Sequence, residues 1–486
     1  MSGQLDPAPA VVRTPANART VSLIVASAMF MEQLDGTVLA TALPAMARSF
    51  HADPLHMNVA LTSYLLTLAM FIPASGKLAD RFGSRTVFRA AIALFTVGSV
   101  ACAQAPTLAF LVAARMLQGV GGAMMSPVGR LVMLRAVSKS ELIRAMAWLM
   151  IPATIGPILG PPVGGFIVTY LSWHWIFYIN VPIGVTGIVL VTRYIEEMRE
   201  PTRTKFDLRG LILAGTALAS IMFGIEMASR GVGSRETALG LIGIGIMSAG
   251  VYALHARRHP QPMLDFRLMQ IATFRLSVIC GSLSRIAVGA MPFLLPMMLQ
   301  LGFGLSAAHS GLITFVSSLG SLGMRLAAPV ILRRLGFRNV LMWIGLVATL
   351  LLAASAGFRP SWPMVAIYVV LLLNGFFQSL QFMAYNTIAY ADMPRPQMST
   401  ATSFYTTFQQ MSLTLGIAAS AGVLAASERM LGHTQLMLSD FSVAFLAVAS
   451  VSLGAPLLSS LLDRSAGAEL SGHRARPGKA RIAVAE

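Results

Sequence analysis

Fourteen stretches of 17–26 mostly apolar residues run through this chain of 486 residues. A helix needs about 20 such residues to cross the hydrocarbon core of a bilayer, because lipid offers no hydrogen-bond partner to its backbone. We therefore predict an all-α polytopic membrane protein with fourteen transmembrane helices. The predicted spans are residues 21–43, 57–75, 87–105, 108–128, 145–170, 175–191, 211–228, 238–254, 276–299, 311–332, 340–357, 364–388, 402–425 and 441–462.

The composition excludes a soluble protein. Apolar residues make up 56% of the chain and charged residues 11%, whereas a soluble domain carries about 25% charged residues. The net charge of +17 would suggest a nucleic-acid partner in a soluble protein. Here we expect no such partner, because the basic residues follow the topology of the spans.

The basic residues gather on one side of the predicted membrane. Of the 36 Lys and Arg residues, 28 border loops on one side, 5 border loops on the other and 3 fall inside spans. Short cytoplasmic loops carry the excess of Lys and Arg. This bias predicts that both termini are cytoplasmic and that the basic tail contacts anionic lipid.

Two cytoplasmic turns have similar sequences. Aligning Gly83 with Gly336 also pairs Arg81 with Arg334 and Arg85 with Arg338. The copies lie eight spans apart in one orientation, which predicts parallel six-helix bundles separated by an inserted helix pair; chance similarity is the alternative. Transporters with parallel halves bind substrate near the bilayer midplane. The predicted segments are a cytoplasmic tail (1–20), an N-terminal bundle (21–200), the inserted pair (201–264), a C-terminal bundle (265–462) and a basic tail (463–486).

The first span contains two acids, Glu32 and Asp35. A charge at the bilayer centre costs about 2.5–3.5 kcal/mol on insertion scales, and residues three apart share a helical face. Such a face must meet water, a base or exchangeable protons. Both acids are candidates for proton coupling; the alternative for Asp35 is a structural ion pair with an intramembrane arginine.

Further polar residues lie within the other spans. Arg115 is expected to tune a nearby carboxylate electrostatically, since a guanidinium does not release its proton. The remaining candidates either line a substrate cavity or form interhelical hydrogen bonds: Gln118, Arg285, Asn374, Gln378, Tyr385 and Gln409.

The fifth span carries small residues at helical spacing. Gly156, Gly160 and Gly164 form a stripe that lets another helix approach closely, and Pro161 and Gly165 adjoin it. The stripe is a packing surface, and a sharper hypothesis makes it a pivot and seal between the two bundles.

Common signatures of ATP hydrolysis and metal binding are missing. The sequence has no GxxxxGK[ST], no HExxH and no metal-spaced Cys/His cluster, and its two cysteines lie in apolar runs. We therefore expect a non-enzymatic protein without cofactor or metal, driven by an ion gradient.

Several motifs resemble those of the major facilitator superfamily, in its fourteen-span EmrB/QacA-type branch of drug:proton antiporters. The turn carrying Gly76, Asp80, Arg81, Gly83 and Arg85 is similar to the cytoplasmic gating motif, whose acid and bases form a charge relay. Arg115-x-x-Gln118 resembles the fourth-helix motif assigned to proton coupling, and the glycine stripe resembles the fifth-helix antiporter motif. Leu34-Asp35 and the segment Trp173 to Pro182 also match the branch.

The resemblance covers nearly the whole chain and implies a proton-coupled exporter of small organic compounds in a bacterial inner membrane. Its expected partners are protons, a small-molecule substrate and lipid; a periplasmic adaptor is left open. Export of an anionic metabolite, such as citrate or a metal–citrate complex, and a non-transporting membrane sensor are the alternatives. Two positions depart from the family pattern, because Ala40 replaces an Asn and Arg333 stands where the first gating loop has Asp80.

Overall fold

The computed structural model describes residues 18–136, 142–197, 207–230, 234–259, 262–394, 397–433 and 435–471, and these residues contain helices and no strand. Most of both predicted tails, and the part of the inserted segment before residue 207, lie outside these ranges. The helical prediction is confirmed for the described residues.

The helices follow one another along the chain with short connections. The first half contains α1 Ala18–Val38, η1 Leu39–Thr41, α2 Leu43–Ser49, η2 Pro54–Met57, α3 Asn58–Phe82, α4 Ser84–Ala103, α5 Leu108–Ala136, α6 Leu142–Tyr170, α7 Trp175–Tyr178 and α8 Asn180–Tyr194. The inserted pair is α9 Leu208–Arg230 and α10 Arg235–Arg258. The second half contains η3 Phe266–Gln270, α11 Ala272–Met297, η4 Met298–Gly302, α12 Ala307–Asn339, η5 Val340–Ile344, α13 Gly345–Ala354, η6 Ser355–Gly357, α14 Met364–Ile388, α15 Met398–Leu431, α16 Leu438–Ser459 and α17 Ala468–Ser471.

Twelve helical segments of the described residues are long and apolar enough to cross a membrane. The predicted count of fourteen is therefore not confirmed. The predicted spans 145–170 and 311–332 lie within α6 and α12. Helix α6 is 29 residues long, and the non-helical backbone at Gly336 separates the predicted spans 311–332 and 340–357.

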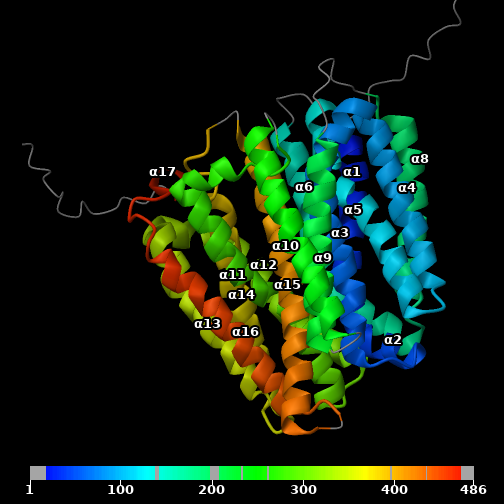
Figure 1. Ribbon diagram of the computed structural model, residues 1–486, viewed down its shortest axis with the longest axis vertical. Coiled ribbons are helices and arrows are strands. Elements are labelled where there is room, and N and C mark those ends of the chain that lie inside the picture. The colour runs from blue at the N-terminus through cyan, green and yellow to red at the C-terminus, as the bar shows by residue number, and fades with distance from the viewer. Residues whose placement is uncertain are drawn as a thin grey trace, which may run out of the picture.

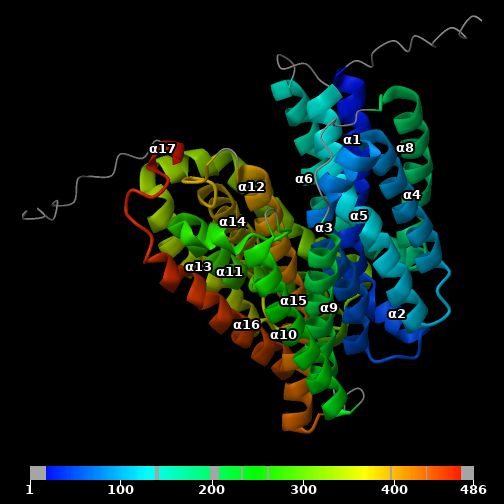
Figure 2. The ribbon, with the colours of Figure 1, turned by 45° about the horizontal axis from the view of Figure 1, so that its top comes forward.

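The two halves repeat one packing pattern. In the first half α1 contacts α6, α3 contacts α5 and α4 contacts α8; in the second half α11 contacts α15, α12 contacts α14 and α13 contacts α16. Between the halves, α6 packs on α12 and α3 packs on α15. Figures 1 and 2 show the resulting two groups of helices side by side.

The inserted pair lies along the seam between these groups. Helices α9 and α10 pack on each other, and α9 contacts both α3 and α15. Leu218 and Met222 of α9 share a small apolar cluster with Leu66 of α3 and Ala418 of α15. Figure 1 shows this pair in green in front of the two groups.

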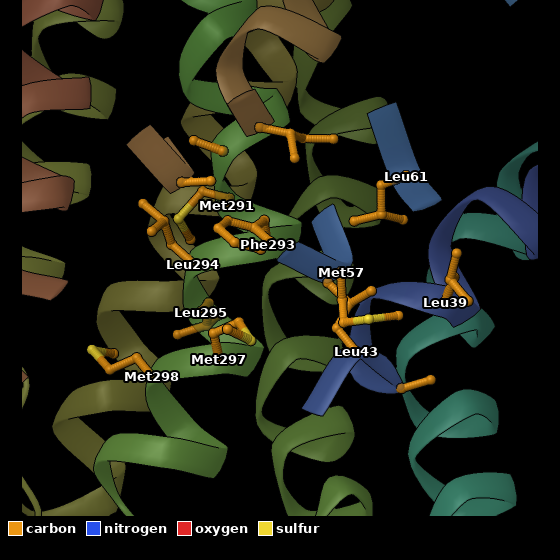
Figure 3. Packing of buried hydrophobic residues seen from close by; sticks show 14 of the residues in the cluster. Leu39, Leu43, Met57, Leu61, Met291, Phe293, Leu294, Leu295, Met297 and Met298 are labelled. Carbon is orange, nitrogen blue, oxygen red and sulfur yellow. The ribbon is translucent and has the colours of Figure 1, made fainter. Parts of the chain in front are cut away.

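Among the described residues, the largest apolar cluster that joins the two halves lies near one end. This cluster joins residues of η1, α2 and α3 to residues of α11 and η4, and Figure 3 shows Leu43 and Met57 near Met297. Near the two gating turns, the buried clusters divide: one contains Val87 and belongs to the first half, and another contains Val340 and belongs to the second. Apolar packing therefore closes the seam at the end that carries α2.

The two gating turns have the same local structure. Gly83 has φ 93° and Gly336 has φ 73°, a region that side chains with a Cβ rarely adopt. The Arg85 guanidinium donates to the Thr192 carbonyl at 2.6 Å, and that of Arg338 donates to the Ser460 carbonyl at 2.8 Å. Each arginine thus ties its turn to the last long helix of its own half, α8 or α16.

The turn geometry predicts different effects for two glycines of the same motif. Gly83→Ala should lower the free energy of unfolding by about 1–3 kcal/mol, because Ala is strained at this backbone conformation. Gly76→Ala, within α3 and with no atom within 4 Å of the added Cβ, should leave stability unchanged or raise it by up to about 1 kcal/mol. Thermal unfolding of both variants in detergent checks this, and equal effects would contradict the assignment.

Candidate functional site

The candidate site centres on a buried ion pair in the first half. Arg115 Nη1 of α5 lies 2.6 Å from Asp35 Oδ2 of α1, and the two side chains are 0% and 1% exposed. The sequence singled out both residues, and the structure brings them together. The geometry matches the ion-pair alternative weighed for Asp35, with Arg115 as the partner.

Uncharged side chains complete the network around Asp35. Its Oδ1 accepts from Gln118 Nε2 and from Asn180 Nδ2, each at 2.9 Å. Both donors also reach Ser99 Oγ, at 2.8 and 3.3 Å. Helices α1, α5 and α8 therefore meet at one carboxylate, and α4 joins the network through Ser99.

Arg115 is held on its other sides as well. Its Nε donates to the Ala60 carbonyl at 2.9 Å, and its Nη1 donates to Gln118 Oε1 at 2.6 Å. The guanidinium carbon lies 4.3 Å from the centroid of the Tyr64 ring, a cation–π arrangement that favours a charged guanidinium. These contacts fix the cation independently of Asp35.

Glu32 lies outside this network. Its carboxylate accepts from Ser126 Oγ of α5 at 2.6 Å, and the residue is 8% exposed. The two acids of α1 therefore use different partners on the same neighbouring helix. Sequence analysis assigned no role to Ser126, because a lone serine in an apolar helix carries no signal of its own.

The residues of the predicted gating motif lie at the junction of α3 and α4. Gly76 and Arg81 are exposed, Asp80 is half-buried, and Gly83 is buried at the turn. Arg85 reaches Thr192 as described, which places the motif against the end of α8.

The glycine stripe of α6 faces α1 of its own half. A Cβ on Gly160 would lie 2.0 Å from Thr37 Oγ1, and one on Gly164 would lie 2.5 Å from the Val38 carbonyl oxygen. Gly156 approaches Gln33 in the same way. The stripe thus makes a close contact within one bundle.

Two neighbouring positions make the contact between the halves. A Cβ on Gly165 would lie 2.3 Å from the Ala307 carbonyl oxygen of α12, and one on Gly311 of α12 would lie 2.2 Å from the Pro161 carbonyl oxygen. The Ala308 amide also donates to a side chain of α6, at 2.9 Å from Thr169 Oγ1. The pivot hypothesis therefore applies to Pro161 and Gly165, whereas the stripe itself packs on α1.

Arg285 is the buried cation of the second half. It is 2% exposed, and its Nη2 donates to Tyr405 Oη at 2.6 Å and to Asn386 Oδ1 at 3.2 Å. Its guanidinium also lies over the rings of Phe382 and Tyr405. No carboxylate of the described residues forms an ion pair with it.

The other cavity candidates differ in their contacts. Asn374 is fully buried, and neither of its amide atoms has a hydrogen-bond partner in the described part of the chain. Tyr385 Oη lies 2.7 Å from Ser459 Oγ of α16, which fits the interhelical alternative. Gln378 and Gln409 are half-buried on α14 and α15.

Comparisons with known proteins match this architecture to one family. The Major Facilitator Superfamily model matches residues 25–417. The chain belongs to the major facilitator superfamily. It is therefore a membrane transporter rather than an enzyme, and its resemblance to this superfamily is confirmed.

Bacterial superfamily members named MdtD, which carry a multidrug-resistance designation, match over most of their length. That of Serratia proteamaculans is 39% identical over 412 residues, covering 83% of this chain and 84% of its own. That of Pectobacterium atrosepticum is 40% identical over 411 residues, covering 84% and 88%.

Solved structures of other transporters share the fold at low sequence identity. The POT family transporter PepTSo has a TM-score of 0.67 and 14% identity, covering 92% of this chain and 98% of its own. The D-xylose-proton symporter has a TM-score of 0.63 and 12% identity, covering 90% and 96%.

The network predicts a structural role for Asn180. Asn180→Ala should lower the free energy of unfolding by about 1–3 kcal/mol, because it removes a donor to a buried carboxylate. Asn339→Ala, on an exposed residue bonded only to its own helix, should change it by less than about 0.5 kcal/mol. Thermal unfolding in detergent measures both variants. An Asn180→Ala variant that is as stable as Asn339→Ala would contradict the network.

Proposed function

We propose that this transporter exports small organic compounds from the cytoplasm in exchange for protons, with Asp35 as the group that binds the proton. The observation that carries the proposal is a carboxylate buried in the first half and held by three donor side chains from two other helices, α5 and α8. Glu32, beside Ser126 on the same helix, is a second group that protons can reach.

The contacts of Asp35 suggest how its protonation would change the packing of α1. Protonation neutralises the carboxylate and removes its attraction for Arg115, while Arg115 keeps the Ala60 carbonyl, Gln118 and the Tyr64 ring. The cation can therefore remain buried while α1 is released. The same step loosens α1 against α5 and α8, because the hydrogen bonds that these helices donate to Asp35 depend on its charge.

In alternating access, the two halves move relative to each other. In the observed arrangement the shared apolar core closes the seam at the end with α2, which we assign to the periplasmic side of a bacterial inner membrane. We assign both termini to the cytoplasm and fourteen spans to the whole chain. Gly165 and Pro161 would serve as the pivot where α6 meets α12.

The experiment is transport by purified protein in proteoliposomes with an imposed pH gradient and a panel of organic cations and neutral drugs. Asp35→Asn should abolish gradient-driven transport, because an amide does not exchange protons. Asp463→Asn, which changes an exposed acid outside the long helices, should keep wild-type rates. Gradient-driven transport at the wild-type rate by Asp35→Asn would refute the assignment.

A stability measurement separates coupling from folding in that experiment. Asp35→Asn leaves Arg115 without its buried counter-ion, so unfolding must be followed alongside transport. A folded variant that still exchanges substrate across the membrane without a pH gradient, yet no longer responds to one, has lost coupling alone.

A second candidate function is export of an anionic metabolite. Arg285 is a buried cation without an acidic partner among the described residues, and a buried charge is costly unless it is paired. A substrate carboxylate would supply that charge. This candidate shares the fold and the proton site with the first and differs in substrate.

Arg285→Gln tests this alternative. Loss of a charged hydrogen bond of about 1.5–3 kcal/mol should weaken binding of a tricarboxylate such as citrate about 10–100-fold. Arg267→Gln, on an arginine that is 60% exposed, is the control and should bind as the wild type does. Binding is measured by competition in detergent, and unchanged citrate affinity in Arg285→Gln, or no binding by the wild type, would exclude the candidate.

A further inference from the structure

We propose that Asp207, His255 and His259 form a binding site for a divalent transition-metal ion of the zinc class. The site joins the start of α9 to the end of α10, so it closes the inserted pair at the end where the chain enters and leaves it. Neither the ion pair at Asp35 nor the gating motif uses these residues.

The three side chains are brought together by the pairing of α9 and α10. One ligand atom from each residue lies within 4.8 Å of the others. Asp207 Oδ1 is 2.8 Å from His255 Nε2, and the rings of His255 and His259 stack with centroids 5.2 Å apart. His255 lies in the last turn of α10 and His259 directly follows that helix, so both imidazoles lie at the end of α10 that faces Asp207.

Asp207 carries the second observation that points to a ligand. The residue is 3% exposed, and its Oδ2 has no hydrogen-bond partner in the described residues, whereas buried polar atoms are nearly always paired. A bound cation would supply the missing partner of Asp207 Oδ2.

The chemistry of the three ligand atoms indicates which class of metal ion would bind. Two imidazoles and one carboxylate suit zinc and related transition metals rather than calcium or magnesium, which prefer oxygen donors alone. Tetrahedral zinc places its ligand atoms about 3.3 Å apart, and binding would require the trio, now within 4.8 Å of one another, to adjust to that spacing. Both histidines are half-buried, which leaves water or a fourth ligand room to complete the shell.

The surroundings connect this site to the gating turn. Lys77 of α3 interacts electrostatically with Asp207 and directly follows Gly76 of the gating motif. A metal ion on Asp207 would compete with Lys77 for the carboxylate charge. Occupancy of the site would therefore change the electrostatic contact between the inserted pair and the gating segment.

The site was hidden in the sequence because its members are not close along the chain. His255 and His259 form a pair that matches no HExxH motif, and Asp207 lies 48 residues before His255. Only the antiparallel packing of α9 and α10 completes the set.

The test uses the full-length protein without a polyhistidine tag and zinc chloride as the probe. Isothermal titration and metal analysis after dialysis should give one zinc ion per chain, with a rise in the unfolding temperature, because a ligand that binds the native state stabilises it. His255→Ala, His259→Ala and Asp207→Asn should each weaken zinc binding at least about tenfold. Zinc binding by the wild type that all three variants retain, or no binding at all, would overturn the proposal.

A second histidine–aspartate pair supplies the matched control. His433 Nδ1 lies 2.9 Å from Asp440, and no third ligand of the described residues joins that pair. His433→Ala should therefore bind zinc as the wild type does, and equal weakening by His433→Ala would contradict the site. If a variant misfolds, the absorption spectrum of Co²⁺ bound to the wild type decides: nitrogen-ligated tetrahedral bands support the site, and the spectrum of hydrated Co²⁺ rejects it. These readouts need no transport, so their failure is distinct from failure of the proposed antiport.

Discussion

The first half of this transporter depends on two opposite charges kept out of water. Removing two ions from water costs more than their attraction returns unless further hydrogen bonds satisfy both partners. Asp35 and Arg115 meet this condition through Gln118, Asn180 and the Ala60 carbonyl. Because those partners come from separate helices, the charge pair also fixes how the helices are arranged. A change in its protonation would act on the whole bundle at once.

Asp35, Arg115 and Gln118 of this site were identifiable from the sequence, whereas Asn180 and Ser99 were not among the predicted site residues. An acid or an arginine stands out in an apolar helix because its burial is costly, so Asp35 and Arg115 were visible singly. Their pairing was only one of two alternatives, since 80 residues separate them. Asn180 and Ser99 carry no such penalty, and amides and hydroxyls are common in membrane helices. Only the packing of α8 on α4 revealed their function in the network.

Other expectations depended on which way a helix faces. Glycine spacing in α6 correctly indicated a close approach, yet spacing alone did not distinguish α1 from the opposite bundle. Tyr385 was grouped with cavity candidates by its position on α14, but its hydroxyl bonds to Ser459. The matched turns at Gly83 and Gly336 were readable from sequence, because positive φ angles require glycine and the paired arginines repeat. Local backbone chemistry is thus easier to predict than the rotation of a helix about its axis.

The position of α9 has a mechanical consequence. This helix rests on α3 from one half and α15 from the other, alongside the contact through which those two helices meet. When the halves tilt, α9 cannot follow both without sliding on at least one of them. Its contacts with α3 and α15 include the apolar side chains Leu218 and Met222, and apolar contacts have no directional bond that must break during sliding. The helix pair would then cover the contact between the two moving halves and separate it from lipid.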